Sequence, residues 1–218
     1  MIERNIIHVG GSPGSGKSRM ARALVDRLHI STDLRAEHIS IGDQVRLLGR
    51  GAIESVLQEY INLHLANPHT ANEPLEEGAM LEVLATSIDS AVGRGTDIIL
   101  LDGYPRYPQQ VSAYFHYAEL YDYNTPGALI TSVDRETALS RIIRRGRNHQ
   151  DRSMSLVQAW NKLQDHDISY PAVIYELGSY GMQFDIHTID TSGQKEYTDN
   201  QAFRATMRLI DESLPRSA

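Results

Sequence analysis

The chain has 218 residues, of which 41% are hydrophobic and 22% are charged, and its formal net charge at pH 7 is -7. This length and composition are typical of one globular core domain with small insertions. An acidic chain without a basic block is a poor candidate for general nucleic-acid binding, so no nucleic-acid partner is expected. The absence of cysteine excludes disulfides, thiolate metal sites and cysteine nucleophiles. No leader pattern and no apolar run long enough to span a bilayer is present, so we expect a cytoplasmic protein without a membrane partner.

The first element of the chain is a short apolar run, residues 6–9, which predicts a buried strand. A glycine-rich loop follows over residues 10–18. After the loop, Met20, Leu24 and Leu28 recur at helical spacing and predict an amphipathic helix. A strand, a loop and a helix in this order are typical of the first unit of an α/β fold.

The next segment predicts one strand and then a long helical region. Residues 36–40 have the pattern of a second strand, and a short helix is expected from Asp43. Residues 53–94 keep a helical periodicity that Pro68 and Pro74 interrupt, and they contain no strand candidate. This region is therefore interpreted as a helical insertion between two strands.

The second half of the chain contains the clearest strand, residues 97–102, a solid apolar run that ends in Asp102. Such continuous runs indicate a parallel sheet that is covered on both faces. Asp134 is expected to cap a helix that ends near Gly146. The remaining predicted elements are strands over residues 127–133 and 184–189, a loop over 146–153, and helices over 156–167, 171–177 and 198–212.

The glycine-rich loop carries a nucleotide motif. Its residues 11–18, G-S-P-G-S-G-K-S, match G-x-x-x-x-G-K-[ST] in full. Glycines let the backbone curl so that successive N–H groups point at phosphate oxygens, and the helix that follows adds its positive N-terminal end. Lys17 can reach the outer phosphates, and the Ser18 hydroxyl suits Mg²⁺. The predicted ATP-binding residues of the loop are Gly11, Gly14, Ser15, Gly16, Lys17 and Ser18. The alternative, a glycine turn without a ligand, is disfavoured by the flanking strand and helix.

A carboxylate is expected beside this loop. Asp102 lies at the carboxyl end of its strand, the end that faces the ligand crevice in an open α/β sheet. A carboxylate in this place holds Mg²⁺ directly or through water. Ser18 and Asp102 are therefore the predicted metal-binding residues, and the alternative for Asp102 is a cap on the turn that follows.

Arginines occur where phosphates are expected, because their planar, paired donors fit phosphate oxygens. Arg46 and Arg106 are isolated in the sequence, whereas a cluster lies near the predicted helix end. A solvated basic helix end, stabilised by the helix dipole, explains the cluster equally well, so its role stays open on charge alone. The members of the cluster are Arg141, Arg144, Arg145, Arg147 and Arg152.

Four segments resemble the adenylate kinase and UMP-CMP kinase family. The first is the phosphate loop. The second, residues 38–46 (H-I-S-I-G-D-Q-V-R), is similar to the family's I-S-T-G-D-x-x-R; the third, residues 101–106 (L-D-G-Y-P-R), is similar to D-G-[FY]-P-R; and the fourth, residues 141–147 (R-I-I-R-R-G-R), is similar to R-x-x-x-R-G. Their order and spacing hold over most of the chain.

The resemblance implies a fold and a domain organisation. The fold is a three-layer α/β/α P-loop architecture with a five-stranded parallel sheet. The organisation is a single kinase domain over residues 1–218, with a core at 1–39, 95–145 and 154–218, a helical NMP-binding insertion at about 40–94 and a short lid at about 146–153. ATP and Mg²⁺ are the implied cofactors, small nucleotides are the implied partners, and a monomer is the family default.

The resemblance also implies roles for individual residues. Lys17 would hold the transferred phosphates, Arg46 and Arg106 the monophosphate, and Arg141 and Arg145 the ATP, with Arg147 or Arg152 acting from the lid. Lys17, Arg46, Arg106, Arg145, Arg147 and Arg152 form the implied catalytic set. The implied NMP-binding set is Ile41, Gly42, Arg46, Gly103, Arg106 and Gln110.

Base choice and activity rest on three positions. Adenylate kinases carry a glutamine at the position of Gln110, which favours AMP as acceptor and the reaction ATP + AMP = 2 ADP. Ile41 departs from the family's threonine, and Asn161 or Lys162 stands where its last catalytic arginine is expected. Two alternatives therefore remain open, which are a P-loop kinase for a different small phosphorylated acceptor and a catalytically weak nucleotide-sensing module.

Overall fold

The computed structural model describes residues 4–49, 61, 76–120, 122–148, 155–180 and 184–213. These residues contain a five-stranded sheet in the order β2-β3-β1-β4-β5, and each pair of neighbouring strands is parallel. The predicted α/β fold with a five-stranded parallel sheet is thereby confirmed. The strands are β1 (Asn5–Gly11), β2 (Ala36–Ser40), β3 (Ile98–Asp102), β4 (Asn124–Ser132) and β5 (Asp185–Asp190).

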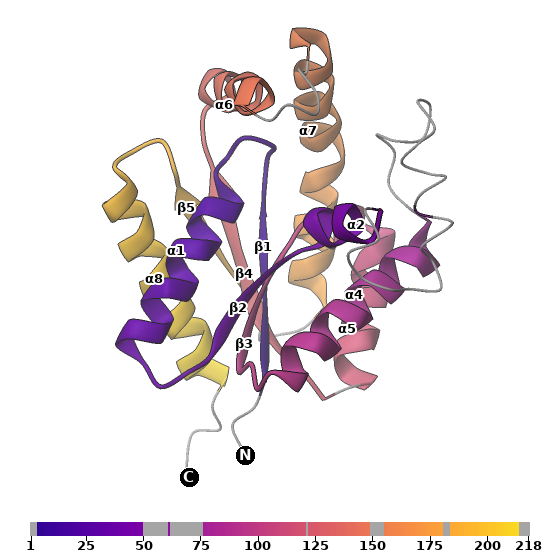
Figure 1. Cartoon of the computed structure of the whole chain (residues 1–218), viewed down its shortest axis with the longest axis vertical. Helices are drawn as coiled ribbons and strands as arrows, with labels where there is room; N and C mark the ends of the chain where they lie inside the picture. Colours follow the sequence, from indigo (N-terminus) through magenta and orange to yellow (C-terminus); the bar gives the residue numbers. More distant parts are fainter. Residues whose placement is uncertain are drawn as a thin grey trace.

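Helices cover both faces of the sheet and complete the three layers (Figure 1). Helices α1 and α8 pack on one face, and α4, α5 and the C-terminal half of α7 pack on the other. Helix α6 lies beyond the carboxyl ends of the strands, next to the N-terminal half of α7 (Figure 1). The helices are α1 (Lys17–Ser31), α2 (Ile41–Gly49), α4 (Glu77–Gly93), α5 (Gln109–Leu120), α6 (Arg135–Asn148), α7 (Leu156–Ser179) and α8 (Lys195–Ser213).

The core is divided by the sheet into two hydrophobic layers. Successive residues of a strand point to opposite faces, so Ile6 packs with α4, α5 and α7, whereas Ile7 packs with α1 and α8. In β3, Leu100 and Leu101 divide in the same way, and all five residues of the strand are buried. This two-sided burial explains why β1 and β3 read as continuous apolar runs rather than as an alternating pattern.

The strand register brings the candidate functional segments together. Val9 pairs with Asp102 on one side and with Leu129 on the other, and Ser40 also pairs with Asp102. The phosphate loop therefore leaves β1 beside the last residue of β3. This edge of the sheet is the carboxyl edge at which open α/β proteins bind their ligands.

Two expectations about the helices after residue 134 are corrected by the structure. Helix α6 continues to Asn148, so the loop predicted over residues 146–153 begins too early. Gly146 costs a helix only about 1 kcal/mol, and arginine, which surrounds it, is a good helix former. The two helices predicted over 156–167 and 171–177 are one helix, α7, with Pro171 inside it. Burial of Tyr170, Val173 and Leu177 offsets the roughly 3 kcal/mol that an internal proline costs.

The predicted insertion is helical where the structure describes it. Helix α2 begins at Ile41, two residues before the expected start, and α4 covers part of the expected helical region. Residues 50–60 and 62–75 lie outside the described part of the chain. Within the described residues, no helix combines the length and the apolar character that crossing a membrane requires.

Candidate nucleotide site

The phosphate loop has the backbone that its glycines were predicted to allow. Gly11, Gly14 and Gly16 have φ values of 123°, 81° and 92°, a region that favours glycine. Gly14 also approaches α6 closely, because an added Cβ atom would lie 2.4 Å from the carbonyl oxygen of Ala138. The loop therefore depends on its glycines both for its curvature and for its packing against α6.

Lys17 is held over the loop by its own backbone. Its Nζ donates hydrogen bonds to the carbonyl oxygens of Gly11 and Ser12, at 2.8 and 2.9 Å. The ammonium group thus lies within the curl of the loop that the motif predicts to hold phosphates. A positive charge at this place suits the outer phosphates of a nucleotide.

Ser18, Asp102 and His38 form a polar cluster beside the loop. The Ser18 hydroxyl donates to Oδ2 of Asp102 at 2.7 Å, and Nε2 of His38 lies 3.4 Å from the same oxygen. Burial of the Asp102 carboxyl opposes its ionisation, but hydrogen bonds with His38 and Ser18 and the charge of Lys17 hold its pKa below the usual value. Asp102 is therefore an anion at neutral pH, at the end of β3 where the sequence predicted it.

The donor set at this cluster fits Mg²⁺ shared with a substrate. Oxygen ligands from Ser18 and Asp102 are the kind that Mg²⁺ prefers, and Mg²⁺ is usually held by one or two carboxylates together with phosphates and water. Among the described residues, no group of three or more histidine, aspartate or glutamate side chains could hold a metal ion by itself. The two residues predicted from the sequence can thus take part in a Mg²⁺ site that a bound nucleotide completes.

Arg141 of α6 contacts the backbone of the loop and of the segment after β5. One of its nitrogens, Nη2, donates to the carbonyl oxygen of Thr191 at 2.9 Å, and Nη1 lies 3.4 Å from the carbonyl oxygen of Gly14. The Thr191 hydroxyl in turn donates to the carbonyl oxygen of Ser15 at 2.5 Å. The guanidinium group is therefore placed next to the backbone that is predicted to bind ATP.

Arg46 and Arg106 converge on the opposite side, at Gly42. A Cβ atom added to Gly42 would lie 3.4 Å from Nη2 of Arg106 and 3.6 Å from Nη1 of Arg46. Arg106 is oriented by a 2.8 Å hydrogen bond from its Nε to the carbonyl oxygen of Gly103, while Arg46 donates to Asp43. Two residues far apart in sequence thus bring two guanidinium groups to one small region.

The surroundings of Arg106 make this region suitable for an anion. The pKa of Arg106 is lowered, mainly because the guanidinium group is partly removed from water and also because Arg46 is positively charged. The charge of Asp102 acts in the opposite direction. The side chain as a whole remains exposed, so the guanidinium can still contact a ligand. An anionic ligand would relieve the repulsion between the two cations.

Two further residues of the predicted NMP-binding set have structural contacts. Ile41 is fully buried in the hydrophobic core at the start of α2. Gln110 is 4% exposed, and its Oε1 accepts hydrogen bonds from the backbone N–H groups of Arg106 and Tyr107, at 2.8 and 3.3 Å. The role of Gln110 in base recognition stays a prediction, and its oxygen holds the backbone in front of α5.

Sequence reasoning missed a buried network beneath the loop. The Tyr170 hydroxyl contacts both the Gly11 N–H, at 3.1 Å, and Nε2 of His8, at 3.0 Å, while Nδ1 of His8 lies 3.1 Å from the carbonyl oxygen of Tyr104. An added Cβ at Gly10 would lie 1.5 Å from the Tyr170 hydroxyl, so the network also explains this glycine. A histidine inside the apolar run of β1 is the sequence signal that could have indicated it.

Three residues of the predicted catalytic set cannot be placed. Arg145 and Arg147 belong to α6 by their backbone, but their side chains lie outside the described part of the structure. Arg152 lies outside the described residues altogether. The structure thus places Arg141 on one side of the loop and Asp102, Gly42, Arg46 and Arg106 on the other, and the three remaining arginines stay predictions.

Comparisons of the sequence with known proteins identify its family and some of its relatives. A family model described as an AAA domain matches residues 6–166. An adenylate kinase of Thermococcus gammatolerans is 32% identical over 138 residues, which cover 62% of this chain and 54% of the relative. An adenylate kinase of Pyrococcus furiosus is 31% identical over 141 residues, which cover 64% of this chain and 54% of the relative. One from Campylobacter hominis is 27% identical over 150 residues, which cover 68% of this chain and 70% of the relative.

The extent of these matches decides what they establish. The family model covers most of the chain and includes the phosphate loop, β3 and α6. The chain spans about half the length of the archaeal relatives that it matches, with 54% of each aligned. The chain therefore belongs to the AAA domain family of P-loop proteins and is a distant relative of the adenylate kinases.

Proposed function

We propose that the protein transfers the terminal phosphoryl group of ATP to a nucleoside monophosphate, with AMP as the first candidate acceptor. The observation that carries this proposal is the short segment 102–106 that joins two charged regions. Asp102 accepts a hydrogen bond from Ser18 of the phosphate loop, and Arg106, four residues later, meets Arg46 at Gly42. An anion-binding region next to a phosphate loop is what a kinase with a phosphorylated acceptor needs.

The arrangement supports transfer by positioning and charge neutralisation, which dominate phosphoryl transfer. The N–H groups of the loop and Lys17 would hold the donor phosphates, and Arg141 would add a contact from α6. Arg46 and Arg106 would hold the acceptor phosphate in line. Mg²⁺, held by Ser18 and Asp102 together with the phosphates, would neutralise charge on the oxygens of the donor. No general base is needed, because the acceptor phosphate is already an anion.

The organisation expected from the sequence enters here as a proposal. A core that contains the sheet would hold ATP, residues 40–94 would form the NMP-binding insertion, and residues 146–153 would contribute a short lid that starts at the end of α6. Closure of the insertion and the lid over the nucleotides would exclude water, so that ATP is transferred rather than hydrolysed. Arg145, Arg147 and Arg152 are the candidates for contacts made on closure.

AMP is the preferred acceptor because of Gln110, and Ile41 motivates one alternative. Ile41 packs in the core and offers no hydroxyl to an acceptor base. A phosphorylated metabolite other than a standard nucleotide is therefore the second candidate acceptor. It would use the same two guanidinium groups, because they contact the phosphate and not the rest of the molecule.

The test is a coupled assay of ADP formation with ATP, Mg²⁺ and a panel of nucleoside monophosphates. We expect AMP to give the largest rate, and a Lys17→Ala variant to lower it by about a thousandfold or more, since loss of a charged group at a transferring phosphate has effects of this order. Lys195→Ala is the matched control, because Lys195 is an exposed lysine at the start of α8. An AMP rate no higher than the rate without acceptor would overturn the assignment of AMP. If no member of the panel is phosphorylated although ATP binds, the monophosphate assignment fails, and the choice lies between a kinase for a different phosphorylated acceptor and a sensing module.

A further inference from the structure

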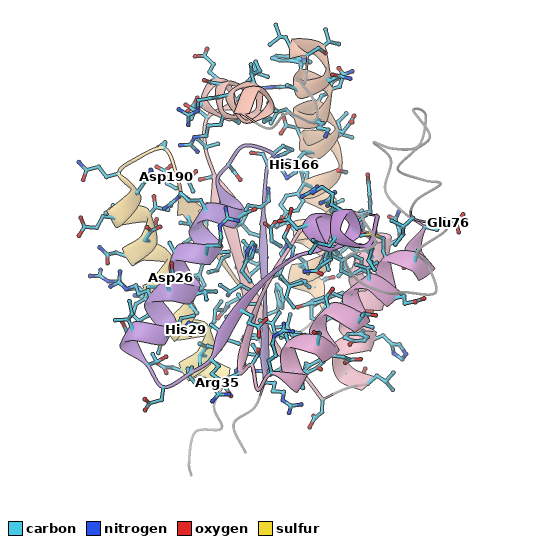
Figure 2. The ribbon with its side chains drawn as sticks, in the orientation of Figure 1. Asp26, His29, Arg35, Glu76, His166 and Asp190 are labelled. Atoms are coloured by element: carbon cyan, nitrogen blue, oxygen red, sulfur yellow. The ribbon has the colours of Figure 1, made fainter. Side chains whose placement is uncertain are left out.

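A histidine outside the predicted site lies against the phosphate loop. His166 is on the side of α7 that faces the loop between β1 and α1 (Figure 2). Its ring stacks on the ring of Tyr170, with centroids 4.4 Å apart and planes inclined by 26°. The hydroxyl of the same tyrosine accepts a hydrogen bond from Gly11 N–H at 3.1 Å. The imidazole is therefore fixed next to the first residue of the loop.

Neither ring nitrogen of His166 has a hydrogen-bond partner of good geometry within the described part of the chain, although both are shielded from solvent. The nearest carboxylate oxygen, Oδ1 of the neighbouring Asp167, lies 3.8 Å from Nδ1, which is too long for a hydrogen bond. The side chain as a whole is 20% exposed, through atoms other than the two nitrogens. Buried polar groups are nearly always paired, so two ring nitrogens without a partner beside the phosphate loop point to a ligand.

The charge around His166 indicates what such a ligand would be. Burial, followed by the positive charge of Lys17, lowers the pKa of His166 to about 4. Asp167, through its charge and a long side-chain contact, and a weak hydrogen-bonding contact with the backbone of Gly11 act in the opposite direction but do not prevail. The imidazole is thus neutral at pH 7, with one N–H donor and one bare nitrogen. The ammonium group of Lys17 is held over the loop and is close enough to lower the pKa of His166. A ligand bound beside both residues would therefore be an anion that accepts hydrogen bonds.

We propose that His166 donates an N–H hydrogen bond to the phosphate chain of the nucleotide held by residues 11–18. The inference rests on the proposed function and deepens it, because it adds a contact from α7 to those of the loop. A phosphate oxygen accepts hydrogen bonds and so satisfies the unpaired N–H. The stack on Tyr170 holds the ring in the orientation that this contact requires.

A purely structural role of His166 is the competing explanation, and two substitutions separate it from the proposal. His166→Phe keeps an aromatic ring to stack on Tyr170 but removes both nitrogens. His166→Gln removes the ring but keeps an N–H donor of similar reach. His187→Phe is the matched control, because His187 on β5 also has a buried ring nitrogen without a partner among the described residues and lies on the edge strand, which pairs with β4 and not with the loop-bearing β1.

The first measurement follows the imidazole directly. Histidine ring correlations between ¹H and ¹⁵N are recorded for the wild-type protein, and the His166 signals are assigned by their loss in His166→Phe. We expect Mg²⁺-ATP and inorganic tripolyphosphate to shift the N–H of His166 as a new hydrogen bond forms, and adenosine to leave it unchanged. Unchanged His166 signals at saturating ATP would overturn the proposal, whatever the enzyme does with acceptors.

The second measurement compares affinity and turnover. A hydrogen bond to a charged group predicts that His166→Phe weakens Mg²⁺-ATP binding or lowers kcat by about tenfold or more, whereas His166→Gln retains most of the wild-type value. Thermal unfolding shows whether each variant is folded. Loss in both variants to the same extent, or in neither, would assign the ring a packing role and overturn the proposal.

The two measurements keep this inference separate from the proposed function. A shifted His166 signal together with a protein that phosphorylates no monophosphate would refute the assignment as a nucleoside monophosphate kinase and leave the phosphate contact standing. Conversely, rapid AMP phosphorylation by His166→Phe with an unchanged KM for ATP would refute the contact and leave the kinase assignment standing.

Discussion

The Tyr170 hydroxyl on α7 accepts a hydrogen bond from the backbone N–H of Gly11, the first residue of the phosphate loop, at 3.1 Å. Because its own hydrogen must then point elsewhere, it donates to Nε2 of His8 at 3.0 Å. His8 therefore carries its hydrogen on Nδ1 and donates it to the carbonyl oxygen of Tyr104 at 3.1 Å. This directed chain links α7, the loop and the segment that contains Arg106.

Removing the Tyr170 hydroxyl should weaken the loop. In Tyr170→Phe, the Gly11 N–H and Nε2 of His8 both lose their partner inside the protein, and leaving buried polar groups unpaired costs about 2 kcal/mol. We expect the free energy of unfolding to fall by about this amount, measured by urea denaturation, and the dissociation constant of Mg²⁺-ATP to rise in calorimetry.

Tyr114→Phe is the matched control for this prediction. Tyr114 is also buried, but its hydroxyl lies 3.4 Å from its acceptor, the carbonyl oxygen of Ile6, and has no role at the loop. Its loss should cost less than about 1 kcal/mol and leave ATP affinity unchanged. Equal effects of the two substitutions would show that the hydroxyl of Tyr170 has no special role.

The neutral state of His8 predicts a dependence of stability on pH. Burial lowers the pKa of His8 to about 4, against smaller opposing effects of Tyr104 and Asp102 and with a small contribution from Lys17 in the same direction. The unfolded chain, with a histidine pKa of about 6.5, binds more protons between these two values. Stability is therefore fully present above about pH 6.5 and is lost as the pH falls towards about 4, by roughly 2 kcal/mol between pH 7 and pH 5.

Urea denaturation at pH 7 and pH 5 checks this prediction with a variant that cannot titrate. In His8→Gln, the part of the pH dependence that belongs to His8 disappears, while the part that belongs to His166, whose pKa is also lowered to about 4, remains. In His116→Gln, which replaces an exposed histidine on α5, the free energy of unfolding should fall between pH 7 and pH 5 as it does in the wild type. Parallel losses in the wild type and in His8→Gln would contradict the assignment.

The two charged regions predict separate kinetic effects. Arg141 lies at the backbone of the loop, so Arg141→Ala should raise the KM for ATP by about tenfold and leave the KM for AMP unchanged, as expected for one lost hydrogen bond to a charged group. Arg106→Ala should raise the KM for AMP by about tenfold and leave the KM for ATP unchanged. Arg144→Ala is the control, because Arg144 is an exposed arginine on the same helix. The measurement is of initial rates with each substrate varied in turn. A rise in the same KM in both variants would contradict the assignment of the two arginines to different substrates.

Asp102 predicts a dependence on Mg²⁺. Asp102→Asn keeps an oxygen for the Ser18 hydroxyl but removes the negative charge that attracts the cation. The Mg²⁺ concentration for half-maximal activity should rise by about tenfold to a hundredfold, the usual effect of a weakened metal environment. Asp97→Asn, just before the other end of β3, should have a wild-type Mg²⁺ requirement, because the Asp97 carboxylate accepts the backbone N–H of Arg35 and lies away from the carboxyl edge of the sheet. A normal Mg²⁺ requirement in Asp102→Asn would exclude Asp102 from the metal site.

The corrected helix boundaries show where sequence patterns are weak. Pro171 and Gly146 are residues that usually end helices, and both lie inside helices here. The local cost of Pro171, roughly 3 kcal/mol, is offset by the burial of its neighbours Tyr170 and Val173, whereas that of Gly146 is only about 1 kcal/mol. Burial depends on elements distant in sequence, so local patterns cannot weigh it.

The sequence by itself determined the features that depend on local backbone chemistry. Residues 11–18 specify a phosphate loop because glycines and a following helix suffice to form one, and the apolar runs of β1 and β3 specify a sheet that is buried on both faces. Only the tertiary structure decided which polar residues meet across the fold. The hydrogen bonds from Tyr170 to His8, 162 positions apart, and from Thr191 to Ser15, 176 positions apart, follow from strand order and helix packing. No local periodicity encodes such pairs, because the free energy that places them comes from burying the whole core.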